Sequence, residues 1–589
     1  MLRKLLLGFC FLLSTFVLTA QTALAGKVTD EDSGEPVEFA TVALYKNGVL
    51  VTGSETDARG NYNFPDIDPG TYDVEASFIG YQSQRITGVK VLAGKVNKLD
   101  IQIGAGGGVI LDEIQVVEYR VPLIEQDNTT SGQVITSETI RNLPTRNINA
   151  LAATAAGLAS ADEGGAITVR GSRATATDYY IDGVRIQGSL IPESEIDQLQ
   201  VITGGVEAQY GDVTGGIISI TTKRSSGKFA GSAEMESSSG VSPYGNSLAG
   251  LSLSGPVWRN QKGQSILGYR FSGRYTYRVD DDPSAVPVYH IKDQKLAELE
   301  ANPVVLQSGS LLVAADFLGA DDVDALKTRP YEESERLDAN LILDAYLSDA
   351  VDISFTGSFT DSKNRFTPDA SWYVLNSQNN PLNTGGTMRG LFKFRHRLGG
   401  NGPESQKSLI QNASYTLQFG AERSEGETAD YRHGLNYFDY GYVGKFDIDW
   451  IPTFSEVYDP IQQRSVLRHT DYRQVLRSYE AGTINPVLAN YNNALGLTQG
   501  EPINAQVGNF ILSDIFDGQS LLSRGSFIAP NGFISSVFNN SWGFHTNVGW
   551  VYNSASKGQN DVYTFNARAN FDIAPSNSDR GRHNIQVGF

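Results

Sequence analysis

Cysteine is almost absent from this chain of 589 residues, and its single copy, Cys10, lies in the first apolar run. A processed form without that run holds no thiol, which excludes disulfides, thiolate catalysis and cysteine-ligated metals. None of the six histidines begins a His-x-x-Glu or His-Glu-x-x-His pattern. No nucleophile, base and orienting residue assemble into a set either. The sequence therefore predicts no catalytic residue, no metal site, no cofactor and no enzymatic activity.

Basic residues are scarce as well. The chain has 47 Lys and Arg against 66 Asp and Glu, which gives a formal net charge of −19. Proteins that bind nucleic acid present a basic face to the phosphates. This composition therefore argues against a nucleic-acid partner.

The sequence has one long apolar run, which lies at the N-terminus, and no other follows it. A basic start, an apolar stretch from Leu5 to Ala20 and the small-x-small residues before Gly26 predict a signal peptide over residues 1–25. Cleavage after Ala20 competes with cleavage after Ala25. An uncleaved anchor is disfavoured, because the run is shorter than the roughly 20 residues of a spanning helix. An integral protein with this sequence would have to cross the membrane as a closed β-barrel.

Residues 26–104 alternate short β-branched runs with turn residues, including the hairpin signal Asn47-Gly48. This spacing predicts a small β-sandwich of about seven strands. The phrases at 26–30, 34–37, 56–62 and 68–72 resemble the carboxypeptidase-regulatory-like (transthyretin-like) family. The resemblance implies a spacer or docking module, not a zinc carboxypeptidase.

Residues 105–120 form a predicted linker that starts in the glycine-rich stretch 104–108. The linker contains a β-prone coupling segment made of Leu111, Asp112, Glu113, Ile114, Gln115, Val116 and Val117. An extended segment on a loose tether suits β-strand addition to the sheet edge of a partner. The segment resembles the TonB box, by which a family of receptors engages the periplasmic TonB protein. An ordinary strand of the first domain is the competing interpretation.

Residues 121–226 predict a mixed α/β unit, with short helices at 136–144 and 147–157 followed by strands and tight turns. Five phrases in order resemble the plug domain of TonB-dependent receptors: 167–171, 178–184, 195–204, 208–212 and 215–223. The resemblance implies structural roles for Arg170, Gly171, Asp182, Gly183, Tyr210 and Gly211. The glycines would permit turns or close backbone approach, and Arg170 would pair with a carboxylate of the barrel wall. An acid/base or metal role for the aspartates is disfavoured, because Asp beside Gly is ordinary turn chemistry.

Residues 227–589 change to a period of two, most clearly at 265–278, 336–348, 351–360 and 563–573. Such strands fit an antiparallel membrane barrel with a wet interior, and a soluble sandwich is the alternative. All five tryptophans fall in this region, as interfacial girdles require: Trp258, Trp372, Trp450, Trp542 and Trp550. We expect long polar loops at 279–330, with a helix at 293–301, and at 451–521.

The strand count predicts an incomplete barrel. We find roughly ten to twelve strand candidates, whereas a plugged outer-membrane transporter has about 22 strands. A complete smaller barrel that ends at the aromatic Phe589 is the alternative.

The predicted chain is mainly β, with a transthyretin-like sandwich, an α/β plug and a transmembrane antiparallel β-barrel. The resemblance implies a Gram-negative outer-membrane receptor that imports a siderophore, glycan or peptide and keeps its N-terminal domain in the periplasm. Its implied partners are the periplasmic domain of TonB, outer-membrane lipid and the extracellular ligand. Residues 178–184 resemble SusC-type glycan importers, which would add a surface lipoprotein, while 204–211 have the general receptor wording. An adhesion or assembly role of the Oar-like kind is the alternative.

Overall fold

The computed structural model describes residues 22–104, 115–118, 131–494 and 548–589, apart from short gaps. The gaps are 47, 58, 80, 93–95, 161–163, 188–190, 207–209, 212, 262, 264, 282–283, 308–309, 349, 369–371, 399–409 and 574–582. Most of the predicted signal peptide and the first part of the coupling segment lie outside the described residues. Among the described residues, no helix combines the length and the apolar character needed to cross a bilayer.

The first domain is a sandwich of two sheets around one apolar core. One sheet contains β1 (Ala23–Asp30), β4 (Asn61–Phe64), β7 (Val96–Lys98) and β8 (Ile101–Ile103). The other has the order β3 (Val49–Glu55), β2 (Thr41–Lys46), β5 (Gly70–Ser77), β6 (Gln84–Val91) and β9 (Gln115–Glu118). Alternating residues of both sheets point inward, as in β5, where every second residue is buried.

The first strand begins before the expected cleavage site. Ala23 is paired with Val96, and Leu24 is fully buried opposite Phe64. Cleavage after Ala25 would remove three residues of β1, whereas cleavage after Ala20 leaves the strand whole. Cleavage after Ala20 therefore fits the packing of the sandwich better than cleavage after Ala25.

The plug unit follows, with a five-stranded sheet of order β10-β15-β16-β13-β14. Its elements are β10 (Ser131–Thr136), α2 (Ser137–Asn142), α3 (Ile148–Ala152), β11 (Leu158–Ser160), β12 (Ile167–Val169), η1 (Ala174–Ala176), β13 (Asp178–Ile181), β14 (Val184–Ile186), η2 (Glu193–Glu195), β15 (Ile196–Gly204) and β16 (Ile217–Thr222). The Asn147 side chain caps α3 by accepting from two backbone N–H groups. The helix ends at Ala152, earlier than the predicted Gly157, because a turn replaces its last part.

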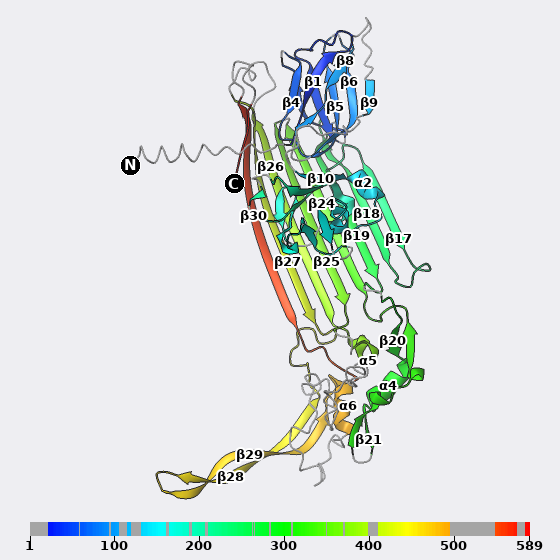
Figure 1. The fold of residues 1–589 in the computed structure, drawn as a ribbon, viewed down its shortest axis with the longest axis vertical. Coiled ribbons are helices and arrows are strands. Elements are labelled where there is room, and N and C mark those ends of the chain that lie inside the picture. Colours follow the sequence, from blue (N-terminus) through cyan, green and yellow to red (C-terminus); the bar gives the residue numbers. More distant parts are fainter. Residues whose placement is uncertain are drawn as a thin grey trace.

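A nine-stranded antiparallel sheet, the wall, forms the largest part of the molecule. Each strand pairs with the next in the order β17 (Ala230–Ser237), β18 (Ser247–Arg259), β19 (Ser265–Arg278), β24 (Ser334–Ser348), β25 (Val351–Arg365), β26 (Leu382–Leu398), β27 (Ile410–Ala429), β30 (Ser556–Ile573) and β31 (His583–Gly588). All four segments predicted from alternation lie in these strands. Figure 1 shows the plug unit against the wall, with the first domain at one end of it.

The long connections gather at the opposite end into a loop cluster, formed by the described parts of 279–333, 366–381, 430–494 and 548–555 (Figure 1). It contains β20 (Val288–Ile291), α4 (Asp293–Ala301), β21 (Val304–Gln307), β22 (Ser310–Val313), η4 (Ala314–Phe317), η5 (Ala320–Asp322), β23 (Val323–Leu326), α5 (Tyr373–Asn376), η6 (Ser377–Asn379), β28 (Gly444–Asp459), β29 (Arg464–Ala481) and α6 (Pro486–Ala494). The cluster has an apolar core of its own, with Leu375 and Tyr491 fully buried. The predicted helix at 293–301 is confirmed as α4.

Two predictions about this region were wrong. The interval 451–521 is not a plain polar loop, since β28 and β29 form a long hairpin and α6 follows. The described tryptophans do not form a girdle as a set either, and Trp542 lies outside the described residues. Trp372 is buried and stacks on Trp550 with 5.6 Å between ring centroids, and Trp550 packs against the apolar core of the loop cluster.

Candidate functional site

The wall has two chemically different faces. Pairing registers place Tyr269, Leu343, Phe355, Phe392, Phe419 and Phe565 in one row across six strands. Phe355, Phe392, Phe419 and Phe565 are between 38% and 53% exposed, so this row is open on the side away from the plug unit. A contiguous apolar surface of this kind marks contact with a partner or a membrane.

The apolar surface has a defined height. Outward-facing positions are apolar or small over residues 337–347, 351–359, 413–421 and 563–573 of four wall strands. These stretches are about 9–11 residues long, the length that a tilted strand needs to cross the hydrocarbon core of a bilayer. At the end toward the loop cluster the same face becomes charged, at Glu335, Asp361, Arg423 and Asp561.

The inner face carries charge at its centre, and the plug unit neutralises it. Glu195, at the end of η2, is 1% exposed and accepts two hydrogen bonds from Arg270 on β19, at 2.7 and 3.1 Å. Glu193 accepts from Arg274 at 2.5 Å and from Arg146 at 3.2 Å. Because alternate strand residues share a face, Arg270 and Arg274 both point at the plug unit. These carboxylates clamp the plug unit onto the wall.

A second contact uses the turn between β13 and β14. Asp182 adopts a positive φ of 49°, and its carbonyl accepts a hydrogen bond from Gln418 of β27 at 2.9 Å. Its carboxylate accepts from the backbone N–H and the hydroxyl of Thr222 on β16, at 3.0 and 2.7 Å. The side chain therefore fixes the turn inside the plug unit, while the backbone holds it to the wall.

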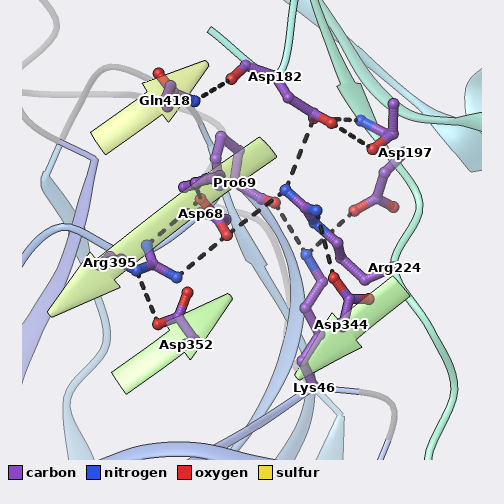
Figure 2. A network of polar contacts seen from close by, with 12 residues as sticks. Lys46, Asp68, Pro69, Asp182, Asp197, Arg224, Asp344, Asp352, Arg395 and Gln418 are labelled. Atoms are coloured by element: carbon purple, nitrogen blue, oxygen red, sulfur yellow. Dashed lines mark hydrogen bonds and ion pairs between the residues drawn. The ribbon is translucent and has the colours of Figure 1, made fainter. Parts of the chain in front are cut away.

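Arg224 lies where the plug unit passes into the wall, and it joins three parts of the chain (Figure 2). Its guanidinium lies 3.5 Å from Asp344 on β24, 3.8 Å from Asp68 of the first domain and 3.9 Å from Asp182. Burial alone would lower the pKa of Arg224, but the carboxylates of Asp182, Asp344 and Asp68 outweigh it and raise that pKa. The cation therefore stays charged although it is only 7% exposed.

The first domain reaches this junction with the loop between β4 and β5. Asp68 lies 2.6 Å from Lys393 and 3.3 Å from Arg395, both on β26. The backbone carbonyl of Asp66 also accepts from Arg395, and its carboxylate accepts from Ser414 on β27 at 2.9 Å. Figure 2 shows Asp68 and Pro69 between Arg395 on one side and Arg224 on the other.

The charge of Asp68 is set by these neighbours. Burial raises the pKa of the carboxyl group, and the cations of Arg395, Lys393 and Arg224 outweigh that effect, so the pKa lies well below its ordinary value. Lys46 of β2 supports the loop by donating to the Pro69 carbonyl at 3.1 Å, and it lies 3.7 Å from Asp197 of the plug unit. The first domain is thus fastened to both the wall and the plug unit.

A polar cavity of about 130 Å³ lies between the three parts, with Asp66, Tyr210, Lys393, Arg568 and Gln586 among its lining residues. Opposite charges around it lie 2.6 to 3.9 Å apart. These ion pairs hold the surfaces of the three parts together. No group of three or more His, Cys, Asp or Glu placed to hold a metal occurs in the described part of the chain.

The residues assigned from the plug resemblance are placed as follows. Gly171, Gly183 and Gly211 all have positive φ, and Gly183 completes the turn that begins at Asp182. Tyr210 packs edge-on against Tyr180 at 5.0 Å, and its carbonyl accepts from the Tyr180 hydroxyl.

Arg170 does not make the expected contact with the wall. It is exposed, and its guanidinium lies beside Gly204 of the plug unit. Among the described residues, no wall carboxylate lies within ion-pair distance of it. The charged contacts come instead from Glu193, Glu195 and Arg224, which the sequence analysis did not single out.

The coupling segment is described only in part. Gln115, Val116 and Val117 lie in β9, which pairs in parallel with β6 of the first domain, and residues 111–114 lie outside the described residues. The backbone of residues 115–118 is therefore a strand of the first domain's sheet, as the competing interpretation expected.

Comparison with known proteins assigns two of the three parts. Residues 23–104 match the carboxypeptidase regulatory-like domain, and residues 125–217 match the TonB-dependent receptor plug domain. A curated relative, the TonB-dependent transporter Oar of Myxococcus xanthus, is 23% identical over 231 residues, which are 36% of this chain and 21% of the relative. The chain thus spans about a fifth of that relative's length.

Among the solved structures that the comparison matches are two siderophore receptors named PirA. The receptor from Pseudomonas aeruginosa is 16% identical with a TM-score of 0.28, over 52% of each chain. The receptor from Acinetobacter baumannii is 16% identical with a TM-score of 0.28, over 51% of this chain and 48% of the receptor. At these scores the likeness is weak.

Proposed function

We propose that this chain, in which a carboxypeptidase regulatory-like domain precedes a TonB-dependent receptor plug domain, is an outer-membrane receptor that imports a scarce nutrient. Energy for import comes from the inner membrane through the TonB protein. The proposed ligand is a siderophore, a glycan or a peptide. The homology to a TonB-dependent transporter supports this class of function.

One observation carries the proposal. The wall has an outward apolar surface of membrane-spanning height, and its opposite face is charged and holds the plug domain through Glu193 and Glu195. A soluble sandwich would cover the apolar face of its sheet with a second sheet. Here the polar face is covered and the apolar face is open, which is the pattern of a membrane barrel with a plugged interior.

The two ends of the wall support an orientation. Short connections at 260–264 and 349–350 lie at the end where the first domain sits, and the loop cluster lies at the other (Figure 1). Outer-membrane barrels have short periplasmic turns and long extracellular loops. We therefore place the first domain in the periplasm and the loop cluster outside, where it would capture the ligand. If the ligand is a glycan, we propose a surface lipoprotein as a further partner.

Two features of the precursor belong to the same proposal. The residues before β1 serve as a signal peptide, and cleavage after Ala20 keeps the sandwich intact. The nine strands described here form one side of a larger barrel, since plugged transporters have about 22 strands.

A matched pair of substitutions tests the coupling in the full-length receptor. Ile114→Pro removes a backbone donor that strand addition needs, whereas Ile114→Ala keeps it. Uptake is measured in cells with iron-loaded siderophores, fluorescent oligosaccharides and fluorescent peptides. We expect the proline variant to lose uptake and to keep binding of the imported compound, while the alanine variant stays near wild type. Equal uptake by both variants, or import of none of these compounds, would contradict the proposal.

A second candidate function is adhesion or surface assembly. The observation that favours it is the hairpin β28–β29, which extends from the loop cluster away from the wall (Figure 1). Its exposed apolar residues include Phe454, Tyr458 and Leu467, and an isolated two-stranded hairpin gains stability from a partner. Loss of cell attachment after removal of the hairpin, with uptake unchanged, would select this function.

A further inference from the structure

The strand β9 belongs to neither of the two domains that match known families, since one match ends at residue 104 and the other begins at 125. It nevertheless lies in the sheet of the first domain. Gln84, Arg85, Ile86 and Thr87 of β6 are paired in parallel with residues 115–118. The first domain therefore holds the described part of the coupling segment in an extended conformation.

The order of this sheet leaves one edge open. β6 is the inner neighbour of β9, and no other described strand pairs with β9 on its far side. Figure 1 shows β9 at the outside of the first domain. The unpaired N–H and C=O groups along an edge strand are a template for another strand, and main-chain pairing of this kind is how extended segments are bound.

The sheet behind β9 is held in a fixed position. At the far end of β6, the Val91 carbonyl accepts from Gln198 of the plug domain at 2.8 Å, and Lys90 lies 3.0 Å from Glu138 across a cleft of about 570 Å³. The Asp68 loop fastens the same domain to the wall. The open edge of β9 is therefore presented at one place beside the plug domain.

We infer that the first domain is part of the coupling site: β6 backs β9, and an extended strand of the periplasmic TonB domain adds to the open edge of β9. This inference rests on the proposed function and names the surface that receives the partner. A segment already held extended loses less conformational freedom on binding, which strengthens binding. In the opposite arrangement, β9 must leave β6 before the partner binds. A cross-link between β6 and β9 would then weaken binding of the TonB domain.

A disulfide tests the pairing first. Thr87 and Glu118 are Cα partners, and adjacent strands lie within disulfide reach. The only native cysteine is Cys10, so a Thr87→Cys, Glu118→Cys receptor reports on this contact alone. We expect it to cross-link in isolated outer membranes much faster than the out-of-register control Arg85→Cys, Glu118→Cys. Equal cross-linking of the two pairs would overturn the pairing.

Binding of the purified periplasmic domain of TonB then shows whether the pairing of β9 with β6 strengthens or weakens the interaction. We expect the oxidised receptor to bind within about twofold of the reduced one, or more tightly. Thr87→Pro should weaken binding by about tenfold, because the segment is then extended for only a fraction of the time, and Thr87→Ala should not. Thr87 has no Cα partner in β5, so the proline spares the β5–β6 ladder.

Two results of the binding experiment would also overturn the inference. One is a loss of binding on oxidation that a reductant restores, which would mean that β9 must leave β6. The other is unchanged binding of the proline variant. A different result would refute the proposed function, and with it the partner: the Thr87→Cys, Glu118→Cys receptor cross-links on oxidation, yet its reduced form fails to bind the TonB domain.

Discussion

Two ion pairs on opposite faces of the wall have the same geometry and different surroundings. Arg270 and Glu195, on the inner face, are joined by hydrogen bonds of 2.7 and 3.1 Å, and so are Arg423 and Asp561 on the outer face. The Glu195 side chain is 2% exposed and the Arg423 side chain is 52% exposed. Burial, not bond length, distinguishes the two pairs.

The difference shows how this sheet separates two environments. Buried charge on the inner face requires a partner, because an unpaired ion away from water is strongly destabilising. Among the described residues, the charged side chains of the outer face lie beyond the apolar stretch, at the end toward the loop cluster, where water screens the pair. The plug domain is therefore held to the wall by paired charges, whereas the outer face presents exposed apolar side chains.

The largest effect is expected from breaking the inner pair. Glu195→Gln leaves the Arg270 cation without a full opposite charge in a buried site, which costs about 3–5 kcal/mol. Urea unfolding of the reconstituted receptor, followed through protease release of the plug domain, measures this loss. A midpoint equal to that of the wild type would show that the clamp does not hold the plug domain.

A charge in the middle of the outer face is expected to rank next. Phe392→Arg places a guanidinium in the apolar row, and Arg near the midplane of a membrane barrel costs about 2–4 kcal/mol. Phe392→Leu is the control, since it stays apolar. Reversible unfolding in phospholipid vesicles gives both values, and equal stability of the two variants would argue against lipid contact at this row.

Asp68→Asn is expected to cost about 2 kcal/mol of first-domain docking, because hydrogen bonds to charged groups contribute roughly 1.5–3 kcal/mol. Since the folded-state pKa of Asp68 lies well below its ordinary value, its contribution is present above an unfolded pKa of about 3.9. It is lost only as the pH falls through the lowered folded-state pKa. The hydrogen-exchange protection factors of the backbone amides in the 66–69 loop should stay constant from about pH 7 to 5. A loss of protection in that range, absent from Asp68→Asn, would contradict this sign.

The smallest effect is expected at the outer pair. Asp561→Asn removes one partner of an exposed ion pair, so we expect its loss of stability to be the smallest of the four, and added salt should reduce that loss further. The same urea assay applies. A loss as large as that of Glu195→Gln would mean that geometry alone sets the strength of these pairs.

Local patterns predicted the strands because alternation is a property of neighbouring residues. Four of the nine wall strands, β19, β24, β25 and β30, and the helix α4 were found in this way. The hairpin β28–β29 was missed although Phe446 and Ile448 alternate with Asp447 and Asp449, since the expected loop was drawn from 451, inside the strand. The tryptophans were misjudged because composition does not say whether a ring faces lipid or a loop core.

The contacts between domains were beyond local patterns. Glu195 meets Arg270 across 75 residues, and Asp68 meets Lys393 across 325. The only available signal was complementary spacing, with two carboxylates at Glu193 and Glu195 and two cations on one strand face. The resemblance of residues 167–171 to the plug domain led us to expect the wall contact at Arg170, but its side chain lies on the plug domain itself.

Spin labels on the full-length receptor in outer-membrane lipid test the central claim most directly. Single cysteines at Phe355, Phe392 and Phe419 probe the outer row, and one at Ser358 probes the inner face. We expect oxygen to relax the outer labels strongly and a water-soluble nickel complex to leave them unaffected, with the Ser358 label shielded from oxygen. Outer labels that relax with the nickel complex as readily as loop labels would show that this face meets water, and the wall would then not be part of a membrane barrel.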